Sequence, residues 1–492
     1  MMQRRILAVL SICLALAPFA LAGNKTQKSS KTKPLVGLMP VTASSAKARE
    51  LYQRGMDDYE NLYLERCNVN WRAAVKEDPS VALAWAWIAF NSRNHSEASA
   101  ARAKAKALLP MVTPGEKLMI QWIANVQEGN YIAGISAMND MLAMFPKDKH
   151  LLYLAGNWLM GENGNDQALK ILDRALALDK NYPAAINDSA YAYARNRQFA
   201  KAFTLMDRYV VVLPREPNPH DSYGELLRMA GHFDEALAHY RMALKVDPNF
   251  ASSQAGIADT YALMGHQAQA RLEYDKAITQ AHNDADRIDY MMQKATTWVR
   301  DANPAEADKA FAETAQKAHE FGLDLQEAQA HQRMAEYQND DAAALKHLQA
   351  AEDALAHRQD ISQLDHDEEL SRILRHRTVR AAHAGSQELA QKSLKMLENM
   401  AAESRNLVIQ SSYHGAAGAL FSVQQKWQDA IAQLEEDHDD PFSMQLLSRA
   451  YYEAGANEKM HAVEERLRGT NVPTIEQAVV VPAARLQKPS TT

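Results

Sequence analysis

Residues 217–250 read PNPHDSYGELLRMAGHFDEALAHYRMALKVDPNF, and the pattern returns in residues 251–284, ASSQAGIADTYALMGHQAQARLEYDKAITQAHND. The matching residues stand 34 apart: Gly231, Ala236, Tyr240 and Ala243 recur as Gly265, Ala270, Tyr274 and Ala277. A period of this length is typical of arrays of stacked helix pairs. The glycine marks a turn, and the spaced alanines and tyrosine mark one face of the helix that follows it.

A frame of 34 residues fits five consecutive units: 115–148, 149–182, 183–216, 217–250 and 251–284. Each unit is predicted to hold a helix, a turn near Gly129, Asn163, Arg197, Gly231 or Gly265, and a second helix. Small residues stand at the eighth and twentieth positions, which lets the helices approach closely. Where the eighth position is the bulky Trp122, the twentieth is Gly134, so we predict that the indole lies over this glycine.

The residues Tyr223-Gly224, Leu227, Gly231, Phe233, Ala236, Tyr240, Ala243 and Pro248 resemble the signature of the tetratricopeptide repeat family. The departure is the tryptophan that the family has at position four, where this chain has Leu118, Leu152, Ile186, His220 and Gln254. The resemblance implies an all-α fold, a right-handed superhelical solenoid of antiparallel helix pairs.

The repeats are predicted to begin near Ala46, so that residues 46–284 form a solenoid. Beyond it the spacing of the apolar helix cores loosens, and residues 285–468 are predicted to be divergent repeats of the same kind. The alternative is a separate helical domain that starts near Asn283. Residues 469–492 carry three prolines without apolar periodicity, which predicts a disordered tail, with a short apolar contact at Val479 to Val481.

The first 22 residues combine Arg4 and Arg5, an apolar run and the ending Ala20-Leu21-Ala22, which predicts a signal peptide cut after Ala22. The alternative is an uncleaved membrane anchor. Residues 23–45, rich in lysine, are predicted to be a flexible linker. The protein is therefore expected to be exported, periplasmic or secreted, without a membrane span once the leader is removed.

Charge and cysteine content exclude some classes of function. Loss of Arg4 and Arg5 with the leader takes the formal net charge from −7 to −9, and an acidic surface argues against a nucleic-acid partner. Cys67 is then the only cysteine, so no internal disulfide can form. The sequence holds no phosphate-binding glycine loop, zinc-protease helix pair or paired-cysteine metal motif, and it indicates no enzyme, metal or cofactor.

The resemblance also implies a binding groove, because in this family the first helix of each pair lines the concave face. Its contact positions correspond here to His150, Tyr153, Asn157, Asn187, Tyr191, Arg195, Asp221, Glu225, Arg228 and Asp259. Amide, phenol and carboxylate groups in a row suit an extended peptide whose backbone needs hydrogen-bond partners. These residues predict a non-catalytic scaffold or adaptor of the cell envelope that binds protein or peptide segments; its oligomeric state is left open.

The alternative function is an enzyme or metal-binding protein with a site in the histidine-rich C-terminal half. His376 and His383 are seven residues apart and fall on one face of a predicted helix. The segment Asp437-His438-Asp439-Asp440 could offer carboxylates to a hard cation, but it lacks the glycine turn and distal glutamate of a calcium loop. We expect the histidines to be exposed and the acidic segment to be a solvated turn.

Overall fold

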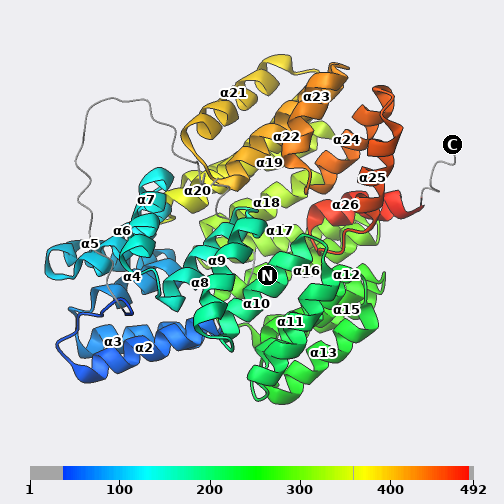
Figure 1. Ribbon diagram of the computed structural model, residues 1–492. Helices are drawn as coiled ribbons and strands as arrows, with labels where there is room; N and C mark the ends of the chain where they lie inside the picture. The colour runs from blue at the N-terminus through cyan, green and yellow to red at the C-terminus, as the bar shows by residue number, and fades with distance from the viewer. Residues whose placement is uncertain (1–36, 358–359, 487–492) are drawn as a thin grey trace, which may run out of the picture. The chain divides into compact units, whose positions relative to one another are not determined.

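A computed structural model describes residues 37–357 and 360–486 of the chain, and over those residues every regular element is a helix (Figure 1). The predicted signal peptide lies outside the described residues. The fold begins with α2 (Ala46–Glu60), α3 (Leu64–Glu77), α4 (Ala82–Asn91) and α5 (His95–Ala107), followed by the short 3₁₀ helix η1 (Leu109–Met111). Ser45 caps α2 by accepting the backbone N–H of Ala48, so the repeats begin where the sequence predicts.

The five units in the 34-residue frame hold five pairs of consecutive helices joined by short turns. They are α6 (Pro114–Gln127) with α7 (Tyr131–Met144), α8 (Lys149–Gly161) with α9 (Asn165–Leu178), α10 (Pro183–Arg195) with α11 (Phe199–Val212), α12 (Asn218–Ala230) with α13 (Phe233–Val246), and α14 (Ala251–Leu263) with α15 (Gln267–Gln280). The residues predicted at the turns, Gly129, Asn163, Arg197, Gly231 and Gly265, all have positive φ. These left-handed residues end the first helix of each hairpin, and the predicted all-α repeat fold is confirmed.

Hairpins continue through the divergent region. They are α16 (Asp284–Arg300) with α17 (Pro304–Glu320), α18 (Asp324–Tyr337) with α19 (Asp341–Ala356), α20 (Gln363–His383) with α21 (Gln387–Glu403), α22 (Leu407–Val423) with α23 (Trp427–Leu434), and α24 (Pro441–Glu453) with α25 (Asn457–Arg468); a 3₁₀ turn η2 (Glu435–Asp437) follows α23. Helices such as α16, α17 and α20 are longer than those of the regular units, which explains the looser spacing in the sequence.

The described chain divides into two compact units. The N-terminal unit holds residues 37–92 and 97–197, and the C-terminal unit holds 93–96 and 198–486. The boundary therefore falls inside the regular repeats, after α10. A separate domain that starts near Asn283 is not what the structure shows, because α14 and α15 pack against α16 within the C-terminal unit.

Close helix contacts depend on glycine, although one predicted pair is wrong. A Cβ built on Gly156 would lie 2.7 Å from Leu172 on the second helix of the same hairpin, so the glycine does allow a close approach, although its neighbour is Leu172 and not the small residue of the twentieth position. The Cβ of Gly134 would instead meet the side chain of Val126 at 2.9 Å. The buried indole of Trp122 packs against Phe90 and Trp158, with ring centroids 6.1 and 5.7 Å away. Trp122 joins an aromatic cluster because neighbouring first helices supply rings of matching size.

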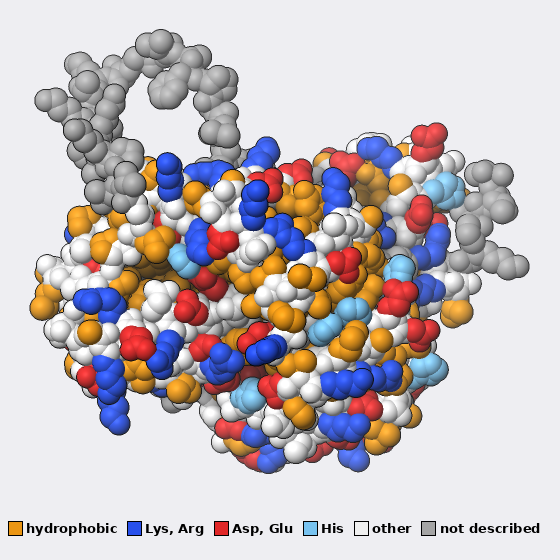
Figure 2. All heavy atoms as spheres, turned by 60° about the horizontal axis from the view of Figure 1, so that its bottom comes forward, with side chains coloured by type: hydrophobic (Ala, Val, Ile, Leu, Met, Phe, Trp, Pro, Cys, Tyr) orange, Lys and Arg blue, Asp and Glu red, His pale blue; other side chains and the backbone are white. Residues whose placement is uncertain are grey.

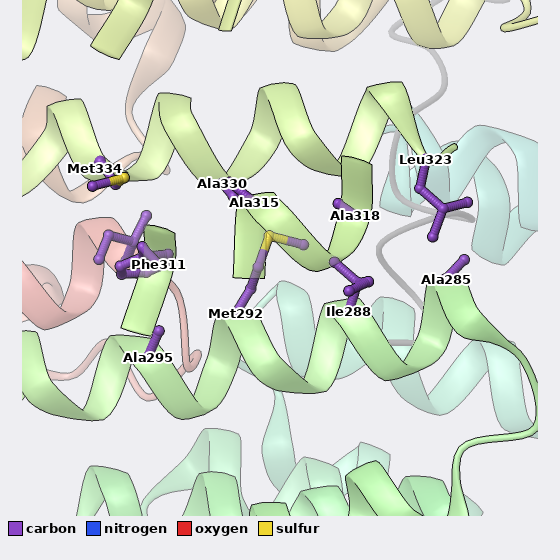
Figure 3. Close-up of a cluster of buried hydrophobic side chains, with 11 residues drawn as sticks. Ala285, Ile288, Met292, Ala295, Phe311, Ala315, Ala318, Leu323, Ala330 and Met334 are labelled. Atoms are coloured by element: carbon purple, nitrogen blue, oxygen red, sulfur yellow. The ribbon is translucent and has the colours of Figure 1, made fainter. Parts of the chain in front are cut away.

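The core of the C-terminal unit lies between successive hairpins. Figure 3 shows Ile288 and Met292 of α16 pointing toward Phe311 and Ala315 of α17, with Met334 of α18 closing the cluster. These side chains come from three helices of two hairpins. No single hairpin could bury them alone, which is the nearest-neighbour packing that repeat proteins require.

The predictions of a flexible linker at residues 23–45 and of a disordered tail at residues 469–492 are both wrong in part. The helix α26 (Ile475–Leu486) occupies the predicted disordered tail, with Ala478, Val480 and Val481 buried. The sequence predicts only a short contact at Val479 to Val481, because the helix is stabilised by burial of its apolar face against the folded repeats and not by its own residues. Within the predicted linker, residues 39 to 45 are held by hydrogen bonds to the repeats, Leu38 is exposed, and residues 23–36 lie outside the described residues.

Candidate functional site

The predicted groove residues lie on the first helices of their hairpins, as the sequence implies. We call the surface formed by the first helices the inner face. Six of the ten residues belong to the N-terminal unit, on α8 and α10: His150, Tyr153, Asn157, Asn187, Tyr191 and Arg195. The other four belong to the C-terminal unit, on α12 and α14: Asp221, Glu225, Arg228 and Asp259.

In the N-terminal unit these residues bond to neighbouring first helices. Asn157 donates to the buried carboxyl of Asp188 at 2.8 Å, and Arg195 donates to the carbonyl of Met160 at 2.6 Å. His150 pairs with Glu60 of α2, and its pKa is raised by that hydrogen bond against the opposing effect of burial. Burial raises the pKa of Asp188 to about 7, although the Asn157 hydrogen bond opposes the shift.

The C-terminal unit repeats this arrangement with charged groups. Arg228 donates to Asp259 at 2.6 Å, and Tyr274 donates to the other oxygen of the same carboxylate at 2.5 Å. Ser253 donates to Asp221 at 2.6 Å. These bonded first-helix pairs are 31 or 32 residues apart, close to one repeat, so the side chains link the α12 hairpin to the α14 hairpin.

The predicted groove residues are therefore only partly accessible to a ligand. Tyr153, Asn187, Tyr191, Arg228 and Asp259 are buried, whereas His150, Asn157, Arg195, Asp221 and Glu225 are half-buried. Spacing along the sequence identifies the face on which a side chain lies. It does not show that neighbouring side chains bond to one another or that α2 reaches α8 through Glu60 and His150.

A row of three carboxylates in the N-terminal unit holds residues 39–45 of the same chain. The backbone N–H of Met39 donates to Asp148 at 2.8 Å, that of Thr42 to Glu116 at 2.6 Å, and that of Ser44 to Asp78 at 2.6 Å. The hydroxyls of Thr42 and Ser44 add bonds to the same carboxylates. Backbone N–H groups make three of these contacts and side-chain hydroxyls make two, so the row suits a peptide backbone that carries small hydroxyl side chains.

The acceptors in this row sit where consecutive repeats meet. Asp148 is the N-cap of α8, Glu116 completes the capping box of α6 with Thr113, and Asp78 is the C-cap of α3. The hydroxyl of Ser80, and then that of Ser44, holds the pKa of Asp78 well below its usual range. These carboxylates therefore lie about one repeat apart because each stands at or next to the end of a helix in successive repeats.

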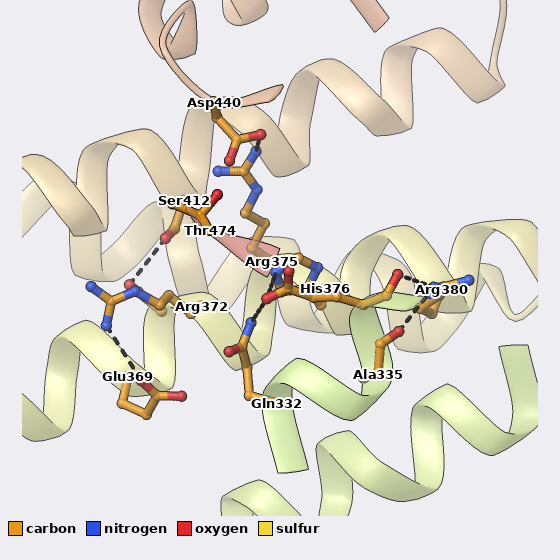
Figure 4. Close-up of polar contacts among 12 residues, drawn as sticks. Gln332, Ala335, Glu369, Arg372, Arg375, His376, Arg380, Ser412, Asp440 and Thr474 are labelled. Carbon is orange, nitrogen blue, oxygen red and sulfur yellow. Dashed lines mark hydrogen bonds and ion pairs between the residues drawn. The ribbon is translucent and has the colours of Figure 1, made fainter. Parts of the chain in front are cut away.

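The inner face of the C-terminal unit carries a polar network that the sequence did not reveal. Figure 4 shows Arg375 of α20 directed at Asp440, Arg372 at Glu369 of the same helix, and Arg380 at the end of α18. Arg380 donates to the carbonyls of Ala335 and Glu336, both at 2.9 Å, and so closes the C-terminus of α18. In sequence these charges look like a solvated helix face, because their partners lie far along the chain.

Arg375 is the centre of this network. Its Nη2 lies 2.8 Å from Asp437 and 2.7 Å from Asp440, and it also donates to Ser443 at 3.0 Å. Gly415 provides the room, because a Cβ there would stand 2.6 Å from the guanidinium carbon. The expectation that the acidic segment is a solvated turn is wrong for Asp437 and Asp440, since the buried arginine compensates their charge.

His376 is half-buried beside Glu336, with Nε2 to Oε1 at 3.6 Å, and Gln332 donates to the same oxygen at 2.5 Å. Burial, reinforced by Arg375, lowers the pKa of His376 to about 3, so the imidazole is neutral at pH 7. Burial raises the pKa of Glu336 well above its usual value, and Glu476 of α26 adds to that shift. The expected exposure of the histidines holds for His383 and is wrong for His376.

Two further observations concern chemistry and location. Across residues 37–357 and 360–486, no group of three or more His, Cys, Asp or Glu side chains is placed to hold a metal ion. In the same part of the chain, each helix is too short or too polar to span a bilayer. On the face drawn in Figure 2, acidic and basic side chains are intermixed with hydrophobic ones.

No protein-family model matches the sequence. Among curated proteins, the chain is similar to the beta-barrel assembly-enhancing protease of Yersinia pestis, with 27% identity over 156 residues. That alignment covers 31% of this chain and 32% of the other protein, so the chain matches about a third of its relative's length.

The fold is similar to that of several solved repeat proteins. A tetratricopeptide repeat protein from Parabacteroides merdae shares 14% identity, with 63% of this chain and all of that chain covered and a TM-score of 0.34. A chain of the Cut9–Hcn1 assembly shares 14% identity, with 82% of this chain and 76% of that chain covered and a TM-score of 0.40. YrrB, described as a tetratricopeptide repeat protein with an unusual peptide-binding site, shares 16% identity. The match covers 38% of this chain and 95% of that chain, with a TM-score of 0.26.

The chain's own register and helix bounds define its class. Between residues 115 and 284, helix pairs recur every 34 residues, with left-handed turn residues at fixed places and glycines where helices approach closely. This is the architecture of a tetratricopeptide-repeat protein, an all-α solenoid.

Proposed function

We propose that the protein is a non-catalytic interaction scaffold of the cell envelope that binds segments of partner proteins on its repeat surfaces. The observation that carries the proposal is that the repeats already bind two segments of their own chain. Residues 39–45 lie extended along the carboxylates of Asp78, Glu116 and Asp148, and α26 lies on the inner face of the C-terminal unit. Recognition of an extended segment and of a helix in a groove are both recurring modes of peptide binding.

The envelope location rests on the predicted leader. The half-buried groups of the inner face, among them Asp221 and Glu225, are the positions we assign to partner contact in the C-terminal unit. Many modest contacts over several repeats would supply the affinity, so removal of one charge has a small effect and removal of several a large one.

The test replaces carboxylates by amides of the same size. It avoids the buried tyrosines of the predicted groove, because their replacement would also disturb packing. The full-length variant D221N/E225Q keeps side-chain volume and removes two inner-face charges. The matched control, D234N/E235Q, makes the same change on the exposed surface of the second helix α13. We expect only the first variant to lose proteins captured by the wild-type chain from envelope extract. Equal capture by both variants would contradict this assignment of the inner face.

A further inference from the structure

Two histidines of one hairpin face each other where its two helices meet. His220 lies in the first turn of α12 and His239 lies in the middle of α13, and their Nδ1 atoms are 3.2 Å apart. The ring centroids are 5.2 Å apart, and both residues are half-buried. The pair is therefore within reach of solvent, while one nitrogen of each ring faces the other ring.

Other repeats hold different pairs at the same two positions. In the 34-residue frame, His220 stands fourth and His239 twenty-third. The next repeat has Gln254 and Glu273 there, and the amide donates to the carboxylate at 2.7 Å. The repeat of α8 and α9 has Leu152 and Ile171, and both are buried. Two imidazoles differ from either pair, because each ring can present a lone pair at Nδ1.

The distance between the two nitrogens fits a shared metal ion. Zinc binds imidazole nitrogen at about 2.0–2.1 Å, so two nitrogens on one ion stand roughly 2.9–3.4 Å apart for angles between about 90° and 109° at the metal. The observed separation of 3.2 Å lies inside this range. Without a metal, one ring donates its Nδ1–H to the other. Coordination needs only a shift of that proton to Nε2 of the same ring, which leaves both imidazoles neutral.

The protonation state of the pair also suits a metal. Burial lowers the pKa of His220, and burial together with the neighbouring His220 lowers the pKa of His239 to about 4. Both rings are therefore neutral at pH 7. Neutral histidine is the form that coordinates a metal, so no proton has to leave the pair first.

Tyr223 of α12 fixes the orientation of the His239 ring. The centroids of these two rings are 4.2 Å apart, and the hydroxyl of Tyr223 donates to Asp207 of α11 at 3.0 Å. Phe203 of α11 stacks on Tyr223 with a centroid distance of 5.8 Å. Supporting contacts of this kind hold metal-binding histidines in the orientation that coordination requires.

We propose that His220 and His239 bind one divalent transition-metal ion, Zn²⁺, Ni²⁺ or Cu²⁺, through their Nδ1 atoms. Imidazole suits these ions, whereas Mg²⁺ and Ca²⁺ prefer oxygen ligands. Over the residues that the structure describes, no third His, Cys, Asp or Glu side chain completes a metal-binding group, so water or a donor group of a bound molecule takes the remaining positions. The ion links α12 to α13, and the site does not depend on the proposed scaffold function.

Titration calorimetry of the full-length chain with ZnCl₂ tests the site. The variant H220L/H239I installs the Leu152 and Ile171 pair of another repeat, so it removes both ligands and keeps side chains that this fold accepts at these positions. The control H232Q removes the exposed histidine that precedes α13 in the same hairpin. We expect equal Zn²⁺ affinity in the wild type and H232Q, and an affinity at least about tenfold lower in H220L/H239I. MgCl₂ should give no binding.

Thermal unfolding provides a second comparison of the same chains. An ion that binds only the folded state raises the Tm, so Zn²⁺ should raise it in the wild type and H232Q and not in H220L/H239I. Equal Zn²⁺ affinity in the wild type and H220L/H239I would overturn the proposal. Loss of binding in H232Q would overturn it as well, because the ion would then be held by exposed histidines.

A measurement on the wild type alone decides the matter if H220L/H239I does not fold. Diethyl pyrocarbonate modifies imidazoles that have a free lone pair, and mass spectrometry gives the rate at each histidine. A metal at Nδ1 leaves Nε2 protonated, so Zn²⁺ should slow the modification of His220 and His239 several-fold and leave that of His232 unchanged. Equal rates at His220 and His239 with and without Zn²⁺ would contradict the proposal.

Discussion

The ring of Tyr240 on α13 lies against Gly256 on α14, so close that a Cβ on the glycine would stand 2.4 Å from Cε1 of the tyrosine. Gly224, in the hairpin of Tyr240 itself, approaches the other side of the contact, with its Cβ position 3.0 Å from the ring. One buried aromatic side chain thus fits between the first helices of two consecutive repeats because both lack side chains at the point of contact.

The first prediction concerns this contact. Gly256→Ala gains helix propensity but forces the Tyr240 ring or a helix backbone to move, so we expect a net loss of about 1–3 kcal/mol in the free energy of unfolding. Urea denaturation measures it. Y240L alone should also lower the free energy of unfolding, but it removes the ring that overlaps the new methyl group. The double variant G256A/Y240L should therefore lose less unfolding free energy than the sum of the two single losses. Additive effects would show that the overlap is not the cause.

Arg375 gives the second prediction. R375M leaves the buried carboxyls of Asp437 and Asp440 without their cation, and we expect a loss of about 3 kcal/mol in unfolding free energy. The control R54M removes an exposed arginine paired with Glu50 and should change stability by less than about 0.5 kcal/mol. Chemical denaturation monitored by circular dichroism compares the two. Equal, small losses would mean that the Arg375 network does not hold α20 to α24.

The third prediction concerns the segment held by carboxylates. T42V removes only the hydroxyl bond to Glu116, whereas E116Q also weakens the acceptor of the Thr42 backbone N–H. Amide hydrogen exchange over residues 39–45 should therefore quicken slightly in T42V and strongly in E116Q. The amides of α24 serve as an internal reference. Unchanged protection at Thr42 in E116Q would show that the segment is held by other contacts.

The fourth prediction is a pH dependence from Glu368. Burial raises the pKa of its carboxyl to about 8 from an ordinary value of 4.5, against the opposing effect of Arg372. The folded state then keeps a proton that the unfolded state has released, so the stabilisation is complete below pH 4.5 and is lost as the pH rises toward 8. Between pH 6.5 and 8 this group alone should lower the unfolding free energy by roughly 1 kcal/mol per pH unit.

E368Q should reduce the slope by that amount, while Asp188, whose raised pKa of about 7 lies in the same window, keeps a part of it. Unfolding at several pH values measures the difference. The window avoids His376, whose pKa of about 3 in the folded state makes the chain lose stability only as the pH falls below 6.5. An equal slope in E368Q and in the wild type would assign the effect to other groups.

The hairpins could be predicted because their signals are local. Gly231 and Gly265 mark turns whatever surrounds them, since the left-handed backbone at those positions favours glycine. The face on which Asn157 or Arg228 lies follows equally from the helical period. The sequence alone therefore predicts the order of the hairpins and the helices that carry the candidate site.

The features that could not be predicted depend on contacts between residues far apart in the sequence. The inward charges of α20 look solvated until Asp437 and Asp440, more than 60 residues away, are placed beside Arg375. The stretch from Val479 to Pro482 is a poor helix former, and α26 exists because the inner face buries it. Trp122 shows the same limit, since its neighbours Phe90 and Trp158 come from other hairpins.

Site-specific photo-crosslinking tests the central claim, that the repeats bind partner proteins on the inner face, most directly. A photoreactive phenylalanine is placed in the full-length chain at Glu225 or Met229 on the first helix α12, and at Lys201 or Arg241 on the exposed second helices α11 and α13. In envelope extract the inner positions should yield discrete crosslinked partners that the outer positions do not. The same crosslinked proteins at both sets of positions, or none at the inner set, would contradict the account.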